Sequence, residues 1–510
     1  MDWLHAAPDA RAIGKLPDVT AITHDSRRIV PGGAFAAIAG GRADGHDYIG
    51  RAVDAGAAVV VVQADREARW APFAERVALL VVPDTRKALG GLAAAVYAEP
   101  SKHLRLIGVT GTDGKTTSAH LTAHVLNTLG KSAAAKGSSQ AQLSCGYLTS
   151  VAFDYGAGRQ MNASHMTTVE STDIQAMLAQ AVAHGVQSMV VEASSEGLAQ
   201  GRLEGCVFDA AMFTNLTRDH LDFHGTMEAY RDAKGLLFEM LDRPNAKGFG
   251  RAAVVNADDP ASPVLAARTQ TARRLTYGIE HAADFRGLDV QPNGFEMRFR
   301  LRAEGVTREA TVPLIGRFNV LNALAAVAVA HSQGYEIEDA VQALTTFTGV
   351  PGRLEVIEEG QPFRVYVDIA STPAAMENVL AALKSATTGR LWVVFGAAGG
   401  RDPNRRTGIG AVAARLADRV VLTSEDPRDE DPEAIIDAIA AALREGGRVE
   451  GSDYVGRADR REAIAYAFEH AEPGDTVLLA GKATEPTMTV RGRDLPWDER
   501  AVARALLTGR

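Results

Sequence analysis

The stretch Leu104-Arg-Leu-Ile-Gly-Val-Thr-Gly-Thr-Asp-Gly-Lys-Thr-Thr117 joins an apolar strand to a glycine-punctuated turn that opens a helix. Gly111 and Gly114 let successive backbone N–H groups face an anion, and the helix N-terminus adds its positive end. Lys115 supplies a charge for outer phosphates, and the Thr116 hydroxyl is a ligand that magnesium accepts. The pattern predicts a nucleotide-phosphate site made of Gly111, Thr112, Asp113, Gly114, Lys115, Thr116 and Thr117.

The helix after this turn has Leu121, Val125 and Leu129 on one stripe, and we expect it to end at Gly130. The glycine spacing departs from the strict phosphate-loop pattern, because Val109 stands where that pattern has its first glycine. A glycine-rich turn with no chemical role is the alternative interpretation. The coincidence of a strand, Gly-Lys-Thr and a helix favours phosphate binding over it.

Composition and charge place the chain among multidomain globular proteins. Its 510 residues are enough for about two to four domains. The net charge of −9, with no block of lysines and arginines, argues against a nucleic-acid partner. Cys145 and Cys206 are too few for a disulfide framework or a cysteine-built zinc site, so we expect both to be buried or incidental.

The sequence also argues against secretion and membrane insertion. Met1-Asp-Trp-Leu-His5 lacks the basic and long apolar regions of a signal peptide. No stretch of the sequence reaches the roughly 20 apolar residues of a membrane-spanning helix. We therefore expect a cytoplasmic protein with no membrane partner.

Three blocks follow one another along the chain. Residues 1–102 contain short apolar strands and hold no obvious catalytic group. Residues 103–349 and 350–510 each alternate strands with helices, as around Ser188–Glu192 in the first and Thr476–Ala480 in the second. This alternation predicts an α/β fold with parallel sheets, in which ligands bind beyond the carboxyl ends of the strands.

Two candidate metal ligands stand at strand ends in the middle block. Glu192 ends one apolar strand, and His220 follows another in the stretch Thr214-Asn-Leu-Thr-Arg-Asp-His220. A metal ion held by nucleotide phosphates is within reach of both residue types. Lys234 lies in a helical stretch, where spacing alone favours a solvent-exposed lysine.

Ordered motifs along nearly the whole chain resemble those of the Mur ligase family, and most closely those of its members that add the third residue of the peptidoglycan peptide. The matching segments are His24–Arg27, Gly32–Phe35, Asp44–His46, Gly108–Thr117, Thr167–Thr168, Glu192–Ser195, Phe213–Asp222, Ala233–Lys234, Asn256–Asp259, Gly316–Asn322, Gly352–Glu355, Val367–Asp368, Gly399–Asp402, Asp426–Arg428, Gly481–Lys482 and Glu485. The resemblance implies a three-domain architecture. It would consist of a UDP-substrate-binding domain (1–102), a central domain with a phosphate-loop ATPase-type parallel sheet (103–349) and a Rossmann-like amino-acid-binding domain (350–510).

The resemblance also implies ATP and Mg²⁺ as cofactors and assigns roles to single residues. The implied catalytic residues are Lys115, Glu192, His220 and Lys234. The implied metal ligands are Thr116, Glu192, His220 and Lys234, of which Lys234 matches a lysine that the family carries as a carbamate, N6-carboxylysine. Asn322, Arg353 and Asp368 would complete the ATP site. The UDP-muramoyl peptide would be held by Ser26, Thr167, Thr168, Ser194, Gln200 and Arg202.

The amino-acid pocket implied by the family consists of Arg401, Glu425, Asp426, Arg428, Gly481 and Glu485. Arg428 suits the second carboxylate of meso-diaminopimelate, because a guanidinium binds a carboxylate in bidentate fashion. Glu425 and Asp426 stand where the diaminopimelate-type motif has Asp-Asn, and the added acid would instead favour the amine of lysine or ornithine. We favour diaminopimelate and keep lysine and ornithine as alternatives.

The implied reaction joins a diamino acid to UDP-N-acetylmuramoyl-L-alanyl-D-glutamate. A carboxylate is a poor acyl electrophile at neutral pH, so ATP first phosphorylates it. Metal ions and Lys115 neutralise the charge of the transferring phosphoryl group, and the amine then attacks the acyl phosphate. The tetrahedral intermediate collapses to an amide and phosphate.

The chain departs from the family where three histidines are replaced, by Glu196, Ser371 and Thr484. Two other functions therefore stay open. A sister amide ligase with a different acyl acceptor would be excluded by binding of UDP-muramoyl dipeptide. A nucleotide-dependent regulatory protein without ligase activity would be excluded by phosphate release that depends on both acceptor and amine.

Overall fold

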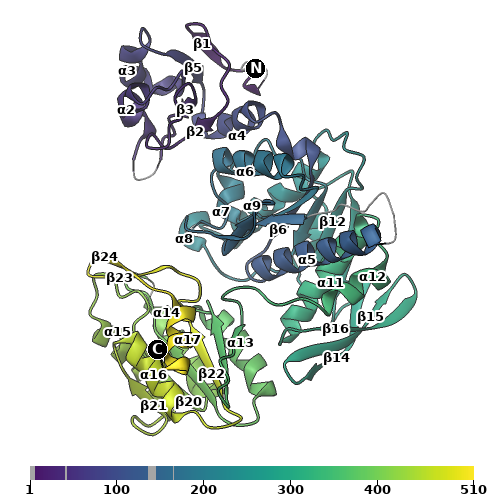
Figure 1. Ribbon diagram of the computed structural model, residues 1–510, viewed down its shortest axis with the longest axis vertical. Coiled ribbons are helices and arrows are strands. Elements are labelled where there is room, and N and C mark those ends of the chain that lie inside the picture. The colour runs from purple at the N-terminus through teal and green to yellow at the C-terminus, as the bar shows by residue number, and fades with distance from the viewer. Residues whose placement is uncertain (1–5, 41–42, 136–144, 165, 402, 510) are drawn as a thin grey trace. The chain divides into compact units, whose positions relative to one another are not determined.

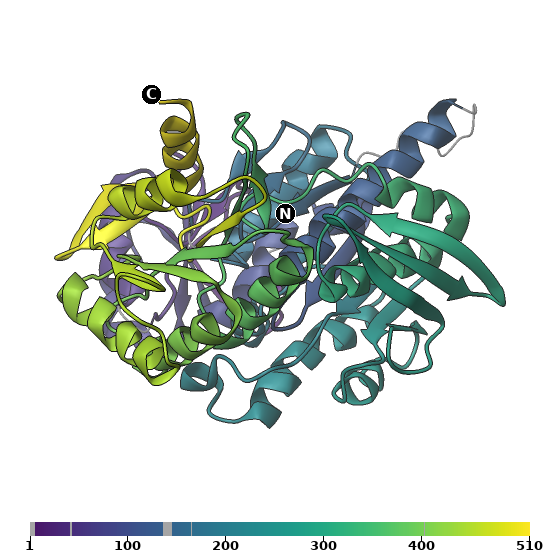
Figure 2. The ribbon, with the colours of Figure 1, turned by 90° about the horizontal axis from the view of Figure 1, so that it is seen from below.

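The computed structural model describes residues 6–40, 43–135, 145–164, 166–401 and 403–509 (Figure 1). The chain forms two compact units. The first contains residues 1–286 and 324–343, and the second contains residues 287–323 and 344–510. Strands and helices alternate through both, as the α/β prediction requires (Figure 2).

The amino-terminal part of the first unit is a five-stranded sheet with helices on both faces. The strands lie in the order β1-β5-β4-β3-β2, and all neighbours are parallel except β1 and β5. Leu89 and Leu92 cover one face, and Ile49 and Trp70 cover the other. The elements are β1 (Arg11–Ile13), β2 (Ile22–Thr23), β3 (Ala34–Ala36), α2 (Ile49–Asp54), β4 (Val59–Gln63), α3 (Glu67–Trp70), β5 (Ala78–Val82) and α4 (Thr85–Val96).

The larger sheet has eleven strands, of which β13-β12-β11-β6-β10-β7-β8-β9, in this order, belong to the first unit. Its strands are parallel from β13 to β7, while β8 and β9 add an antiparallel edge. The elements are β6 (Arg105–Thr110), α5 (Lys115–Ala135), β7 (Cys145–Leu148), β8 (Ala152–Asp154), β9 (Gln160–Met161), α6 (Ser171–Ala183), β10 (Ser188–Glu192), α7 (Ser195–Ala199), β11 (Ala210–Phe213), α8 (Leu221–His224), α9 (Met227–Glu239), β12 (Ala252–Asn256), α10 (Ser262–Ala266) and β13 (Arg273–Gly278).

Helices cover both faces of this larger sheet. Helix α5 packs over β7, where the ring centroids of His120 and Tyr147 lie 4.2 Å apart. Tyr147 pairs through β10 with Ile107, so the next residue of β6, Gly108, faces the opposite side. There α9 lies so close that a Cβ on Gly108 would come within 2.5 Å of the Leu237 side chain. The missing side chain at position 108 thus allows α9 to approach the strand that leads into the phosphate loop.

The second unit begins with an antiparallel ribbon and continues as a six-stranded sheet. The sheet order is β17-β18-β22-β19-β20-β21, with all neighbours parallel except β17 and β18. Its elements, with those shared between the units, are β14 (Phe285–Asn293), β15 (Glu296–Ala303), β16 (Val306–Val312), α11 (Arg317–Ser332), α12 (Ile337–Leu344), β17 (Glu355–Ile357), β18 (Arg364–Asp368), α13 (Pro373–Ala386), β19 (Leu391–Phe395), α14 (Asn404–Leu416), β20 (Arg419–Leu422), α15 (Pro432–Glu445), β21 (Tyr454–Gly456), α16 (Arg460–His470), β22 (Thr476–Ala480), β23 (Thr487–Val490), β24 (Arg493–Pro496) and α17 (Glu499–Thr508).

The six-stranded sheet is covered on both faces. Leu380, Ile409 and Ile439 bring α13, α14 and α15 onto one face. Ile464 of α16 and Ala503 of α17 pack on the other. The carboxyl ends of the parallel strands therefore open onto loops between two helical layers, which is where ligands bind in such sheets.

One sequence prediction about the elements is wrong. Helix α5 does not end at Gly130 but continues to Ala135. A glycine inside a helix costs only about 1 kcal/mol relative to alanine, and the alanines at 133–135 are strong helix formers. Both cysteines are buried, as expected, and burial raises the pKa of each thiol to about 12.

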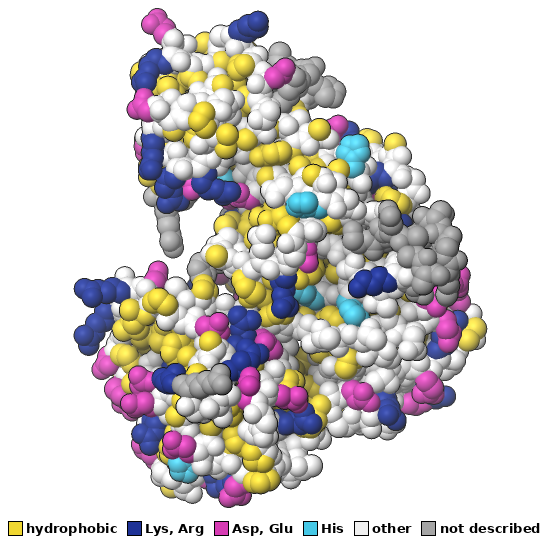
Figure 3. Space-filling view, in the orientation of Figure 1, with side chains coloured by type: hydrophobic (Ala, Val, Ile, Leu, Met, Phe, Trp, Pro, Cys, Tyr) yellow, Lys and Arg dark blue, Asp and Glu magenta, His cyan; other side chains and the backbone are white. Residues whose placement is uncertain are grey.

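The charged side chains on the surface are of both signs, which agrees with a moderate net charge. On the face shown in Figure 3, Lys and Arg side chains lie among Asp and Glu side chains. Within the described ranges, no helix combines the length and the apolar character needed to cross a membrane.

Candidate functional site

The phosphate loop lies between β6 and α5, as the sequence predicts. Gly111 has a φ of +145°, and a Cβ there would overlap the hydroxyl of Thr214. Gly114 has a φ of +81°. Both positions use backbone conformations that favour glycine, so the shape of the loop depends on these two residues.

The loop that follows β11 braces the phosphate loop from one side. The Thr112 N–H donates to the Asn215 carbonyl at 2.8 Å, and the Asp113 N–H donates to Asn215 Oδ1 at 2.9 Å. Thr214 Oγ1 donates to the Asp113 carbonyl at 2.6 Å. The central turn is thus held by two consecutive residues of a neighbouring strand end.

Lys115 and Lys234 converge on one backbone oxygen. Lys115 Nζ donates to the Gly111 carbonyl at 3.0 Å, and Lys234 Nζ donates to the same carbonyl at 2.7 Å. Lys115 also donates to the Thr112 carbonyl at 2.7 Å. Two lysines that the sequence places far apart therefore lie side by side beneath the phosphate loop.

Lys234 is buried, which contradicts the exposed helix lysine that spacing alone favoured. Its side chain is among the fully buried ones, and its Nζ lies 4.2 Å from the centroid of the Tyr230 ring. Burial, and then the charge of Lys115, lower the pKa of Lys234 well below its ordinary value. The reason is tertiary packing, because α9 presents this residue to the sheet and not to solvent.

Ser150 contacts two of the candidate metal ligands, Thr116 and Glu192. Thr116 Oγ1 lies 3.0 Å from Ser150 Oγ, and the Ser150 N–H donates to Glu192 Oε1 at 3.2 Å. Glu192 is 1% exposed at the end of β10. The Thr116 hydroxyl and the Glu192 carboxylate are thus connected through Ser150 at the start of α5. Both groups supply hard oxygen donors.

His220 lies at the start of α8 in a left-handed conformation, with a φ of +51°. Its Nδ1 lies 3.4 Å from Glu196 Oε1, and its Nε2 lies 3.4 Å from Asp219 Oδ2. Nearby, His224 Nε2 is 3.0 Å from Ser195 Oγ. Glu196, which replaces a family histidine, therefore faces His220, the histidine predicted to be a metal ligand.

Four of the residues expected to hold the UDP-muramoyl peptide form one hydrogen-bonded group. Thr168 Oγ1 donates to the Glu192 carbonyl at 2.8 Å and accepts from the Ser194 N–H at 2.9 Å. Arg202 donates to the Thr168 carbonyl at 2.8 Å and to Gln200 Oε1 at 2.7 Å. This group is therefore coupled directly to the end of β10.

The other two expected UDP-substrate residues belong to the same unit. Ser26 is buried in the loop between β2 and β3, and the neighbouring His24 contacts Thr172 of α6 at 2.9 Å. Thr167 precedes Thr168 and is partly exposed. The loop with Ser26 thus rests against the start of the helix that follows Thr167 and Thr168.

Asn322, Arg353 and Asp368 lie in the second unit. Asp368 ends β18, and its two carboxylate oxygens accept from the Leu354 and Ala370 N–H groups, each at 2.7 Å. Asn322 donates to Asn319 Oδ1 at 3.0 Å inside α11. Asp368 therefore fixes the turn that carries Arg353.

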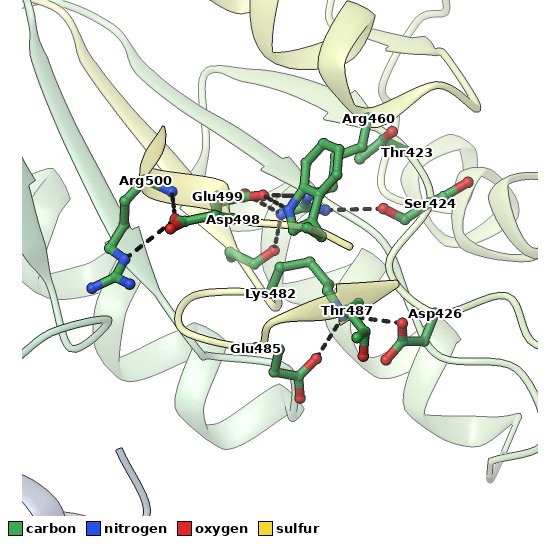
Figure 4. Close-up of polar contacts among 12 residues, drawn as sticks. Thr423, Ser424, Asp426, Arg460, Lys482, Glu485, Thr487, Asp498, Glu499 and Arg500 are labelled. Carbon is green, nitrogen blue, oxygen red and sulfur yellow. Dashed lines mark hydrogen bonds and ion pairs between the residues drawn. The ribbon is translucent and has the colours of Figure 1, made fainter. Parts of the chain in front are cut away.

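The turns after β20 and β22 are joined by Lys482 (Figure 4). Its Nζ donates to Asp426 Oδ1 at 3.0 Å, to Glu485 Oε2 at 2.7 Å and to the Thr487 carbonyl at 2.6 Å. These three bonds use all three protons of the fully buried ammonium group. Asp426 and Glu485 are thus brought together by a lysine that was not among the predicted site residues.

Glu425 and Arg428 flank this group. Glu425 is 7% exposed and abuts Gly481, where a Cβ would lie 2.8 Å from Glu425 Oε2. Burial raises the pKa of Glu425 to about 7, although Arg460 and Arg405 oppose the shift. The Arg428 guanidinium reaches the turn after β19, next to Gly400, and Arg401 in that turn is exposed.

Known proteins resemble this chain in sequence and fold. Three family models match the chain: the catalytic domain of the Mur ligase family over residues 18–97, the Mur ligase middle domain over residues 109–330 and the Mur ligase, glutamate ligase domain over residues 352–483. A UDP-N-acetylmuramyl-tripeptide synthetase of Deinococcus radiodurans is 41% identical over 497 residues, which are 97% of this chain and 95% of that protein. The chain belongs to the Mur ligase family.

Two further similarities support this assignment. A UDP-N-acetylmuramoyl-L-alanyl-D-glutamate–2,6-diaminopimelate ligase of Geobacillus thermodenitrificans is 38% identical over 508 residues, covering 100% of this chain and 97% of that one. The solved structure of a ligase with the same name has a TM-score of 0.65 and 30% identity, covering 96% of this chain and 95% of that one. The predicted resemblance to Mur ligases and the α/β architecture are confirmed, and the chain is a ligase.

The oxygen donors of the Mur ligase site fit a magnesium ion. Thr116 and Glu192 meet through Ser150, and hydroxyl and carboxylate oxygens are ligands that Mg²⁺ accepts alongside nucleotide phosphates. Among the described residues, no three His, Cys, Asp or Glu side chains are arranged to hold a metal ion by themselves. The magnesium ligands, including His220 and Lys234, therefore remain a prediction that depends on bound phosphates.

Sequence reasoning missed several residues that shape the ligase site. Ser150, Tyr230 and Asn215 contact the phosphate loop or its lysine partner but belong to no metal-ligating or charged pattern. Lys482 was visible as part of a motif, and its charge was the signal that could have identified it. Arg460 carries no motif signal, because its partner Glu499 is 39 positions away in the sequence.

Proposed function

We propose that this Mur ligase adds a diamino acid to UDP-N-acetylmuramoyl-L-alanyl-D-glutamate, with meso-diaminopimelate favoured. The names of the relatives from Deinococcus radiodurans and Geobacillus thermodenitrificans support the acyl substrate. Three domains, at residues 1–102, 103–349 and 350–510, would contribute the UDP-substrate, ATP and amino-acid sites. The separate family models over each part of the chain support this division.

The observation that carries the proposal is the convergence of Lys115 and Lys234 on the Gly111 carbonyl. Lys115 would neutralise a phosphoryl group of ATP. The lowered pKa of Lys234 favours the neutral amine, which is the form that reacts with carbon dioxide to give a carbamate. A carbamate there would be an anion next to Lys115 and would help to hold magnesium. When bound, magnesium would stabilise the charge that develops during phosphoryl transfer.

Phosphoryl transfer would then depend on how these residues hold the substrates. The N–H groups at the start of α5 would bind the phosphates, while Asn215 accepts from the Thr112 and Asp113 N–H groups and keeps the loop in shape. The Thr168, Ser194 and Arg202 group would position the acyl acceptor next to the end of β10. Little covalent work falls to the protein, so positioning dominates catalysis.

Two observations in the amino-acid site favour diaminopimelate over lysine or ornithine. Asp426 pairs with Lys482, so the acid that replaces the family asparagine has its charge balanced within the chain. Among the described residues, no carboxylate lies within ion-pairing distance of the Arg428 guanidinium. Arg428 therefore fits the additional carboxylate of diaminopimelate, and a bidentate pair would provide the selection.

The test is a product assay with UDP-N-acetylmuramoyl-L-alanyl-D-glutamate, ATP, Mg²⁺ and a panel of amino acids, read by mass spectrometry and phosphate release. The expected result is an amide product with meso-diaminopimelate at the highest kcat/KM. Preference for lysine or ornithine would refute the amine assignment but leave the ligase reaction in place. Product formation only with another acyl acceptor would refute the whole proposal.

A further inference from the structure

A buried ion pair lies directly behind the amino-acid turns of the second unit. Arg460 begins α16 and Glu499 begins α17, and both side chains are 0% exposed. Arg460 Nε donates to Glu499 Oε2 at 2.9 Å, and Arg460 Nη2 donates to Glu499 Oε1 at 2.6 Å. Trp497 Nε1 donates to Glu499 Oε2 at 2.7 Å, so the carboxylate is held from two directions.

The remaining donors of Arg460 point at two strand ends. Nη1 donates to the Ser424 carbonyl at 3.1 Å, and Nη2 also donates to the Ala480 carbonyl at 2.8 Å. Ser424 immediately precedes Glu425 and Asp426, and Ala480 immediately precedes Gly481 and Lys482. One guanidinium thus fastens the base of both turns that carry the proposed amino-acid pocket.

This arrangement needs the guanidinium group itself. A bidentate pair with Glu499 uses one side of the planar fork, which leaves N–H groups in fixed directions for the two carbonyls. A lysine at position 460 would balance the Glu499 charge, but its N–H groups all leave from one nitrogen, whereas the bonds of Arg460 leave from three nitrogens, so lysine cannot reproduce their positions and directions. Lys482 joins the two turns a second time through its bond to Asp426. A shift of either strand end would therefore move both Asp426 and Glu485.

We propose that Arg460, held in place by Glu499, is a positioning residue that sets the KM for the amino acid and the discrimination between amino acids. It acts through the Ser424 and Ala480 carbonyls and not by contact with substrate. Helix α17 thereby contributes to the selection of the amino acid, because it supplies the carboxylate that orients Arg460. The proposal rests on the proposed function of these turns as the amino-acid site.

The test compares Arg460→Lys, Arg460→Met and Glu499→Gln with wild type in the full-length enzyme. We expect each change to raise the KM for the preferred amino acid by about tenfold or more, as a misplaced positioning group does. The KM values for ATP and the UDP-substrate should change much less, because Arg460 donates to the Ser424 and Ala480 carbonyls and not to the predicted ATP-site residues Arg353 and Asp368 of this unit, and the phosphate loop lies in the other unit. Preference among meso-diaminopimelate, lysine and ornithine should narrow in the same variants.

Arg448→Met is the matched control. Arg448 also donates to two backbone carbonyls of the second unit, those of Ala414 and Ala417, at 2.8 and 2.6 Å. These carbonyls belong to the end of α14 and the residue after it, away from the amino-acid turns. The control should lose stability without a selective change in the KM for the amino acid.

A merely structural role for Arg460 would give a different result. Activity would then fall with the folded fraction while every KM stayed constant, and that outcome would overturn the proposal. If Arg460→Met fails to fold, Arg460→Lys and Glu499→Gln still test the proposal, because both substitutions nearly preserve the volume of the buried side chain. Amide hydrogen exchange of residues 424–428 and 481–485 gives a readout without substrate, and unchanged protection in both variants would also overturn the proposal.

The same measurements separate this inference from the proposed function. Wild-type enzyme that forms no product with any amino acid would defeat the proposed function. Faster exchange at 424–428 and 481–485 in Arg460→Lys, with Arg448→Met unchanged there, would still support Arg460 as the residue that positions these turns.

Discussion

Replacement of Lys234 by methionine should remove ligase activity while leaving the fold in place. Lys115 Nζ and Lys234 Nζ lie 3.0 and 2.7 Å from the same Gly111 oxygen, so the two nitrogens are at most 5.7 Å apart. Two positive charges at that separation repel by about 3 kcal/mol or more at an effective dielectric constant of 20. Burial of Lys234 adds to this cost, and both effects favour its neutral amine.

Carbamate formation reverses the sign of this interaction. The neutral amine adds to carbon dioxide with loss of a proton, so a positive group becomes a negative one next to Lys115. The repulsion of about 3 kcal/mol would become an attraction of similar size. The lowered pKa of Lys234 also sets the direction of the pH dependence, because a fall in pH protonates the amine and returns the carbamate to carbon dioxide.

The assay follows phosphate release in the presence of UDP-substrate, amino acid and ATP. Lys234→Met should lower kcat by about a thousandfold, equivalent to about 4 kcal/mol, if its anion supports the metal during phosphoryl transfer. A short carboxylate such as acetate should restore part of the activity in Lys234→Ala, where the truncated side chain leaves space for it. The carbamate should also appear as a resonance in carbon NMR after incubation with labelled bicarbonate.

Lys247 provides the matched control for labelling. It is also buried, but its Nζ lies 2.6 Å from Asp209 Oδ2 and donates to three backbone carbonyls. Burial also lowers the pKa of Lys247, but the ion pair with Asp209 opposes this shift and keeps the proton on the amine. Lys247→Met should therefore keep the labelled resonance and Lys234→Met should lose it. Activity of Lys234→Met within about tenfold of wild type would refute the reasoning, as would a fully active enzyme without the resonance.

Three further changes test other parts of the structure. Gly111→Ala should lower stability by about 2–4 kcal/mol in urea unfolding and weaken ATP binding, because the added Cβ overlaps the Thr214 hydroxyl; unchanged nucleotide affinity would contradict the loop assignment. Arg428→Ala should raise the KM for meso-diaminopimelate by an amount equivalent to about 2–5 kcal/mol and leave that for lysine nearly unchanged, and equal losses for both would contradict carboxylate recognition. Glu425, with its folded pKa raised to about 7, keeps its proton while the unfolded chain releases one, so the contribution of Glu425 to stability should fall as pH rises from 4.5 to 7. Glu425→Gln should remove about 3 kcal/mol of that fall, measured as the difference between the two proteins at pH 5 and pH 8; parallel curves would refute the shift.

Local sequence patterns were sufficient to predict buried strands and the position of the phosphate loop. The strands Ser188–Glu192 and Thr476–Ala480 have the bounds that their apolar runs predict. Buried parallel strands are continuous apolar runs, so their limits are marked by polar residues on either side. The same locality explains the error at Gly130, because a single glycine signals a helix end only when the following residues are poor helix formers.

The environment of Lys234 could not be read from spacing. Its burial depends on the approach of α9 to β6, which is permitted by Gly108 more than a hundred positions earlier. Likewise, the pairing of Asp426 with Lys482 depends on two strands being neighbours of β19 in the sheet. Family resemblance supplied a role for Lys234, but the physical reason for that role, a buried amine next to a second cation, required the fold.

The three replaced histidines affect the two units differently. In the first unit, Glu196 faces His220 at 3.4 Å, so an acid is added next to a proposed metal ligand. In the second, Arg405 donates to the Ser371 hydroxyl at 2.5 Å, and Thr484 packs against Gly352. Each substituted residue therefore has local contacts of its own. Since the loop of Lys115 makes none of these contacts, the replacements argue for a change in how substrates are held and not for loss of ATP-dependent activation.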